Sequence, residues 1–344
     1  MKRPPIQNPP IPHIVPAICL VFLNILACFS SASVIAQKQD FSPMSKRVAS
    51  HAGSWYSDNR AELDRQLTKW LQAVSPSNEL MPSRGLIAPH AGFSYSGPTA
   101  AHAFRHLDPS RVARIFVLGP SHHYYLTGGA LTGHKYYSTP LGDIEIDQKV
   151  NQELMATGEF EKMSRDVDED EHSLEMHMPF IKKVMEGSKQ RYTVVPVMVG
   201  SLTPEKEALF GRIFAKYLAD PSTFFAISSD FCHWGQRFRY TYHDPKHGEI
   251  YQSIEQLDRD GMAAIETLNP AVYHKYQEHY RNTICGRHAI AIFMHALNYD
   301  SASRGVSGDY AIRFVKYAQS SACRSKSDSS VSYAAAVLRD AVAA

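Results

Sequence analysis

The chain has 344 residues, and 44% of them are hydrophobic, so it can bury a substantial core and is not expected to be globally disordered. Its 36 lysines and arginines nearly balance its 34 aspartates and glutamates, which leaves a net charge of +2. So balanced a chain lacks the electrostatic footprint of a nucleic-acid-binding protein. The 17 histidines are an unusual number and raise the question of a metal site.

Residues 1–43 differ in composition from the rest of the chain. Lys2 and Arg3 precede a proline-rich stretch, residues 14–29 are almost wholly apolar, and small residues follow. This order is typical of a secretory signal, and the apolar run is shorter than the ~20 residues that a transmembrane helix needs. A signal anchor is the second alternative. A third is that the protein starts at Met44, which would make residues 1–43 an alternative upstream extension.

The cysteines favour a reducing compartment. Three of the five lie beyond the extension, and the scattered Cys232, Cys285 and Cys323 form a poor disulfide framework. We therefore expect a cytoplasmic protein whose folded part spans residues 44–340. Secretion or membrane anchoring through residues 1–43 is the alternative.

The folded part alternates between amphipathic segments and short apolar runs. Helical spacing predicts helices over residues 60–74, 100–107, 249–265 and 288–299, and a further helix after Pro204. Continuous apolar runs predict buried strands over residues 85–88, 115–118, 193–199 and 224–228. This alternation predicts one α/β domain with a mainly parallel central sheet covered by helices. Its expected core includes Leu86, Ile87, Val117, Leu118, Val195 and Ala226. The alanine-rich residues 331–342 are expected to form a terminal helix or a fraying end.

Histidines follow three of the predicted strands. His90 comes shortly after the first strand, His122 after the second, and Asp230 and His233 after the last. In open parallel sheets, ligands bind outside the carboxyl ends of the strands. A single histidine at a strand end is usually structural, but three at equivalent positions favour a shared site.

Cys285 is a fourth candidate because it precedes a predicted helix. A helix N-terminus stabilises a thiolate, and Arg287 and His288 add positive charge nearby. Two imidazoles and one thiolate would leave open positions on a metal, as reactive metal sites require. The plainer interpretation is that Cys285 packs at the start of the helix.

A second polar concentration spans residues 166–171 and continues to His172, Glu175 and His177. The two histidines are five residues apart, which is not the spacing of a zinc-protease helix. The segment could supply contacts around the ligands. We favour a solvated acidic loop.

Several long motifs resemble those of the Memo family, from about residue 45 to residue 338. They are residues 50–56 (SHAGSWY), 88–92 (APHAG), 118–123 (LGPSHH), 168–176 (DEDEHSLEM), 228–240 (SSDFCHWGQRFRY), 282–288 (NTICGRH), 319–321 (QSS) and 328–334 (DSSVSYA). The extension before Met44 has no counterpart in the family pattern.

The resemblance implies a fold similar to class III non-haem iron extradiol dioxygenases and a role in cell-motility signalling downstream of receptor tyrosine kinases. It also implies an iron or copper site with His90, His122 and Cys285 as metal ligands. Asp230 and His233 line the same pocket and are the candidate catalytic residues. A cysteine in place of the dioxygenase carboxylate makes ring cleavage doubtful, because thiolate softens the site toward Cu(I).

Two functions from different classes remain. The first is a metal-dependent redox-signalling protein. The second is a non-catalytic adaptor that binds phosphotyrosine peptides in a relic pocket, as the resemblance also suggests. No arginine cluster in the sequence independently supports the adaptor.

Overall fold

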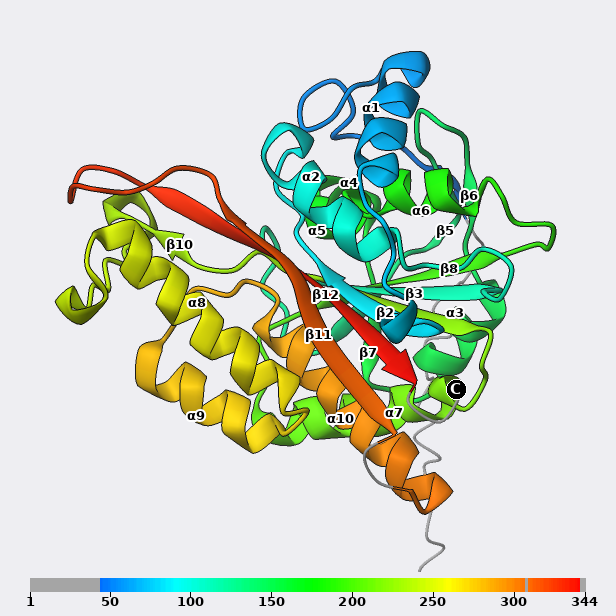
Figure 1. Cartoon of the computed structure of the whole chain (residues 1–344). Coiled ribbons are helices and arrows are strands. Elements are labelled where there is room, and N and C mark those ends of the chain that lie inside the picture. The colour runs from blue at the N-terminus through cyan, green and yellow to red at the C-terminus, as the bar shows by residue number, and fades with distance from the viewer. Residues whose placement is uncertain (1–43, 307–308, 341–344) are drawn as a thin grey trace, which may run out of the picture. The chain divides into compact units, whose positions relative to one another are not determined.

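Four parallel strands form the centre of the main sheet in the computed structural model, which describes residues 44–306 and 309–340 (Figure 1). They lie side by side in the order β2 (Ser83–Ala88), β9 (Thr223–Ser228), β3 (Arg114–Pro120) and β8 (Thr193–Val199). Each neighbouring pair is parallel. The predicted parallel core is therefore confirmed. All six predicted core residues are fully buried: Leu86, Ile87, Val117, Leu118, Val195 and Ala226.

Mostly antiparallel strands extend this core to a nine-stranded sheet. On the β2 side lie β12 (Ser330–Asp340), β11 (Tyr310–Gln319) and β10 (His233–Trp234). On the β8 side lie β4 (Gly129–Leu131) and β7 (Phe160–Lys162). A separate three-stranded sheet consists of β1 (Met44–Arg47), β5 (His134–Tyr137) and β6 (Ile144–Glu145).

Strand β12 corrects the prediction of a terminal helix or fraying end over residues 331–342. Residues 334–338 are fully buried, and β12 pairs with both β2 and β11. Alanine favours a helix in isolation, but its small side chain also fits between a sheet and closely packed helices. Pairing with two neighbours outweighs the local preference here. Residues 341–344 of that prediction lie outside the described residues.

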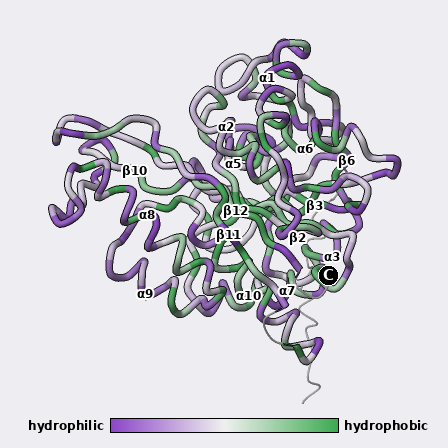
Figure 2. Tube along the Cα trace, in the orientation of Figure 1, coloured by the Kyte–Doolittle hydropathy of each residue, from purple (hydrophilic) through white to green (hydrophobic). Residues whose placement is uncertain are grey.

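Helices cover both faces of the sheet (Figure 1). One face packs against α7 (Pro204–Leu218), α8 (Ile250–Glu266), α9 (Pro270–Tyr280) and α10 (Arg287–Arg304). The other packs against α1 (Arg60–Gln72), α2 (Phe93–Phe104) and α6 (Met178–Met185). Hydrophobic residues gather along the sheet between these layers (Figure 2). The five predicted helices all exist, with shifted ends.

Local capping chemistry explains where several helices begin. Asn59 accepts a hydrogen bond from the backbone of α1, and Thr203 does so for α7, with Pro204 in the first turn. Asn269 caps α9 in the same way, and Glu249 forms a capping box with Gln252 at the start of α8.

Shorter elements complete the chain. They are the helices α3 (Gln148–Met155), α4 (Arg165–Asp170) and α5 (His172–Glu175), and the 3₁₀ turns Asn78–Leu80, Gln236–Phe238 and Pro245–His247. None of the helices in the described ranges is long and apolar enough to cross a membrane. The signal, anchor or extension predicted at residues 1–43 lies outside the described residues.

Candidate metal centre

The strand order brings three of the predicted site segments to one edge of the sheet. Strand β9 lies between β2 and β3, and all three run in the same direction. His90, Asp230 and His122 follow these three strands at their carboxyl ends. The rings of His90 and His122 lie 5.2 Å apart, and the backbone N–H of His90 donates to Oδ1 of Asp230 over 2.9 Å.

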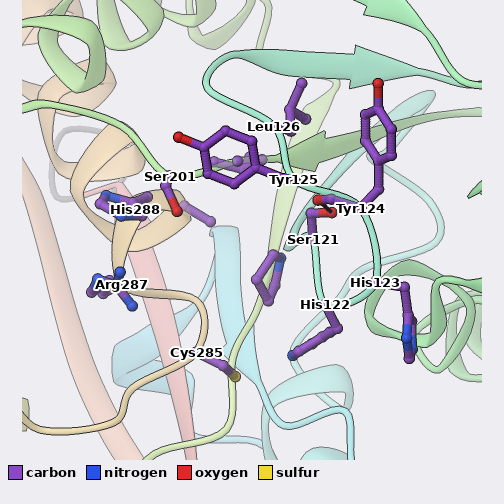
Figure 3. Close-up of a pocket in the computed structure, with 14 residues that line it drawn as sticks. Ser121, His122, His123, Tyr124, Tyr125, Leu126, Ser201, Cys285, Arg287 and His288 are labelled. Atoms are coloured by element: carbon purple, nitrogen blue, oxygen red, sulfur yellow. Dashed lines mark hydrogen bonds between the residues drawn. The ribbon is translucent and has the colours of Figure 1, made fainter.

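Cys285 reaches the same edge from the loop before α10. Its Sγ lies 3.2 Å from Nε2 of His90 and accepts a hydrogen bond from the backbone N–H of Asp230, also over 3.2 Å. A Cβ on Gly286 would lie 2.4 Å from the carbonyl oxygen of Ser228, so only glycine allows the loop to approach β9 this closely. Figure 3 shows the side chains of Cys285 and His122 directed toward each other.

Neighbouring groups fix which nitrogen each imidazole presents. The hydroxyl of Ser228 donates to the carbonyl of Ser173, so it must accept the hydrogen bond from Nδ1–H of His90. Nδ1 of His122 lies 2.9 Å from Oε1 of Glu171, and the other carboxylate oxygen, Oε2, accepts the backbone N–H of His122. Both rings therefore leave Nε2 for a metal, the arrangement in which a hydrogen bond at Nδ1 orients a metal-binding histidine.

His172 adds a third imidazole that the sequence analysis did not select. Its ring stacks on His122 at 4.4 Å between centroids, and the ring of Trp55 lies 4.3 Å from it at a tilt of 32°. Possible ligand atoms of His90, His122 and His172 all lie within 4.8 Å of one another. Nδ1 of His172 is buried with no hydrogen bond within the described part of the chain, and its nearest carboxylate oxygen, from Glu171, is 3.5 Å away. This cluster could hold a metal ion.

The favoured interpretation of residues 166–177 as a solvated acidic loop is wrong for five of its acidic and histidine side chains. Asp168, Glu171, His172, Glu175 and His177 are all buried. The alternative, that the segment contacts the predicted ligands, agrees with the hydrogen bonds between Glu171 and His122. The resemblance was the sequence signal that could have marked this segment as part of the site, because residues 168–176 form one of its longest motifs.

Burial and hydrogen bonds act in opposite directions on the protonation of the site. Burial raises the pKa of the Cys285 thiol, even though a hydrogen bond to His122 acts in the opposite direction. The predicted stabilisation of a thiolate by the N-terminus of α10 is therefore not the controlling effect. Burial also lowers the pKa of His172 to about 3, so this imidazole is neutral at physiological pH and has a lone pair available. At His122 the balance is reversed, because burial would lower its pKa but hydrogen bonds to Cys285 and Glu171 raise it to about 10.

Asp230 and His233 lie beside the cluster. Burial raises the pKa of Asp230, although the charge of His233 and the N–H of His90 counteract this effect. Nδ1 of His233 lies 2.9 Å from the carbonyl oxygen of Phe231 and 3.1 Å from that of Thr283, so it must be the donor. His233 thus also presents Nε2, as a proton acceptor requires.

A cavity of about 370 Å³ adjoins the cluster (Figure 3). His122 and Cys285 line it, and so does Tyr125, which is 82% exposed. Arg287 and His288, in the first turn of α10, also line the cavity. The volume suits a small organic molecule.

The family model for Memo-like proteins matches residues 47–337. The chain belongs to the Memo family. It is 53% identical to protein MEMO1 of Mus musculus and 52% identical to protein MEMO1 of Homo sapiens, in each case over 292 residues that cover 85% of this chain and 97% of the relative. It is 51% identical to the memo-1 homolog of Caenorhabditis elegans, over 85% of this chain and 82% of that protein. The predicted family is thereby confirmed.

Proposed function

We propose that this Memo-family protein binds an iron or copper ion through His90, His122 and Cys285 and acts as a redox protein in cell-motility and cytoskeletal signalling. One observation carries the proposal. The sulfur of Cys285 lies 3.2 Å from Nε2 of His90, and His122 directs its own Nε2 to the same place. The signalling context is suggested by the family resemblance.

The donor chemistry supports iron and copper. Two imidazoles and a thiolate suit Cu(I) as well as iron, whereas magnesium and calcium prefer oxygen ligands. His172 offers a third imidazole, so the site can present either two nitrogens with one sulfur or three nitrogens. Compared with the two-histidine, one-carboxylate site of the dioxygenases, the thiolate of Cys285 replaces the carboxylate and softens the site toward Cu(I). We therefore do not expect ring cleavage.

The protein groups around the site have separate tasks. When bound, the metal supplies one-electron redox chemistry. Glu171 and Ser228 hold the imidazole rings in orientation through their Nδ1 atoms. His233 accepts or returns a proton at Nε2, and the buried Asp230 stabilises the protonated ring.

The phosphotyrosine-peptide adaptor is the competing function. Among the described residues that line the cavity, Arg287 is the one arginine. Recognition of a phosphate usually relies on several charge-assisted hydrogen bonds, often from clustered arginines. The lining therefore favours the metal, and we also propose a cytoplasmic location, in keeping with the three free thiols of the described residues.

The experiment titrates Fe(II) and Cu(I) into the metal-free protein and records O₂ consumption of the loaded protein. Cys285→Ser should lower the affinity for Cu(I) at least about tenfold, because a hydroxyl does not ionise near neutral pH and is a poor soft ligand. Cys323→Ser, which removes a buried thiol outside the site, is the matched control and should bind as the wild type does. Equal affinity in all three proteins would remove Cys285 from the site. Metal binding without O₂ consumption would leave the adaptor as the better function.

A further inference from the structure

Asp258 is a buried acid that the proposed chemistry does not use. It lies on α8, its side chain is fully buried, and it does not line the cavity beside the metal centre. A buried carboxylate is costly unless hydrogen bonds compensate for the lost hydration. Its hydrogen-bond partners therefore indicate what the protein gains from it.

One carboxylate oxygen of Asp258 joins the two loops that carry the site. Oδ1 accepts the backbone N–H of Cys232 over 3.2 Å, and this residue lies between Asp230 and His233. The same oxygen accepts Nδ2–H of Asn282 over 2.9 Å, three residues before Cys285.

The other oxygen attaches this junction to the sheet. Oδ2 accepts the hydroxyl of Tyr317 on β11 over 2.9 Å, and that hydroxyl lies 3.2 Å from the hydroxyl of Ser332 on β12. Strand β12 in turn bonds the loop at Cys232, since the N–H of Ser332 donates to the carbonyl of Cys232 over 2.9 Å. The Ser332–Cys232 bond therefore fixes the Asp230–His233 loop to the sheet without Tyr317, and Asp258 joins the Asn282 loop to it.

The loops also meet near the site. The backbone N–H of His233 donates to Oγ1 of Thr283 over 2.7 Å, and the N–H of Gly286 donates to the hydroxyl of Ser229 over 3.0 Å. These contacts align the loops with each other. Asp258 acts at the other end of the Cys285 loop, at Asn282, and fixes the point from which the chain turns toward Cys285.

We propose that Asp258 is a positioning residue of the metal centre, which holds the Cys285 loop against the Asp230–His233 loop so that the sulfur meets His90. The inference rests on the proposed function in taking Cys285 as a metal ligand. The geometric part, that Asp258 restrains the thiol of Cys285, holds without a metal.

The hydrogen bonds rather than the charge should perform this task. Burial raises the pKa of Asp258 to about 6, although hydrogen bonds from Ser332, Asn282 and Tyr317 favour the carboxylate. Asparagine at this position keeps an Oδ1 that can accept from Cys232 and Asn282, and its amide can donate to the hydroxyl of Tyr317. Alanine keeps neither.

Four variants separate positioning from general stability. Asn282→Ala and Asp258→Ala break the junction, and the first retains the buried acid in case the second does not fold. Asp258→Asn is the conservative variant that should restore the wild-type behaviour. Tyr317→Phe is the matched control, because it removes a hydrogen bond to Asp258 that involves neither loop.

The first measurement is the alkylation rate of Cys285 by iodoacetamide in the metal-free protein, located by peptide mass. Asn282→Ala and Asp258→Ala should accelerate it about fivefold, since the net contribution of one hydrogen bond corresponds to roughly that factor in a loop-opening equilibrium. Asp258→Asn and Tyr317→Phe should react at the wild-type rate. Equal rates in all five proteins, or acceleration in Tyr317→Phe as large as in Asn282→Ala, would overturn the inference.

The second measurement is the absorption of the Co²⁺-loaded proteins, in which a bound thiolate gives a sulfur-to-cobalt charge-transfer band. The band should be strong in the wild type and Asp258→Asn and weakened in Asn282→Ala. Its absence from the wild type would refute Cys285 as a ligand and hence the proposed function, while the alkylation result would still decide the role of Asp258. A wild-type band that persists unchanged in Asn282→Ala would refute the positioning role alone.

Discussion

Arg47 forms two buried ion pairs, with Asp168 and with Glu175. Replacing it with methionine tests how the segment beside the candidate metal centre is kept in place. The side chain of Arg47 is fully buried. Its Nη2 also donates to the carbonyls of Asp168, over 2.7 Å, and Glu171, over 2.9 Å. Methionine retains the apolar stem but removes these hydrogen bonds and leaves the buried Asp168 and Glu175 without their arginine partner.

The expected loss follows from the buried charges. Removing one partner of a buried ion pair costs about 3–5 kcal/mol, because the other charge remains without compensation. The pKa of Glu175 shows that Arg47 is one of several groups that stabilise this carboxylate. Burial would raise this pKa, but His51, Arg47 and Tyr56 together lower it from 4.5 to about 2. The whole net shift corresponds to about 3 kcal/mol at neutral pH, of which Arg47 supplies a part. Arg47→Met should therefore destabilise the protein by about 3–5 kcal/mol.

The pH dependence has a defined sign. The folded pKa of Glu175 is depressed, so its contribution to stability is present above pH 4.5 and is lost as the pH falls toward 2. In Arg47→Met the pKa of Glu175 should be lowered less, so the protein should lose less stability as the pH falls through this range.

Equilibrium urea denaturation, repeated between pH 7 and pH 3, measures both effects. Arg165→Met is the control, because Arg165 is 56% exposed and its pair with Glu169 should contribute well under 1 kcal/mol. A loss below about 1 kcal/mol in Arg47→Met, or a loss equal to that of the control, would refute the reasoning that Arg47 compensates buried charge.

Two further predictions concern the metal centre. Glu171→Gln removes the charge that holds Nδ1 of His122 and should weaken metal binding about tenfold in a competition titration; unchanged affinity would show that the carboxylate does not orient the ring. Gly286→Ala places a Cβ 2.4 Å from the carbonyl oxygen of Ser228 and should displace the loop that carries Cys285, with a similar loss of affinity and about 1–3 kcal/mol of stability. Gly187→Ala, whose Cβ meets nothing closer than 3.7 Å, is its control, and equal behaviour of the two variants would contradict the steric account.

The sequence was sufficient for the parallel core. Its four central strands are continuous apolar runs, because both faces of each are covered by helices, and such runs are visible without any tertiary information. The five helices were recognisable from the helical spacing of their apolar residues, which likewise requires no tertiary information. Strands β11 and β12 were not. Residues 334–336 are three alanines in a row, and alanine becomes strand only because β2 and β11 supply partners on both sides.

For the site, the sequence by itself determined that His90, His122 and Asp230 follow three apolar strands and that Cys285 precedes a helix. Only the tertiary structure decided that β9 lies between β2 and β3, which brings these residues to one edge. It also decided that His172 turns inward and that the Cys285 thiol has a raised pKa. The physical reason is that strand position follows from local hydrophobicity, whereas burial, hydrogen-bond partners and pKa depend on groups that are distant in the chain.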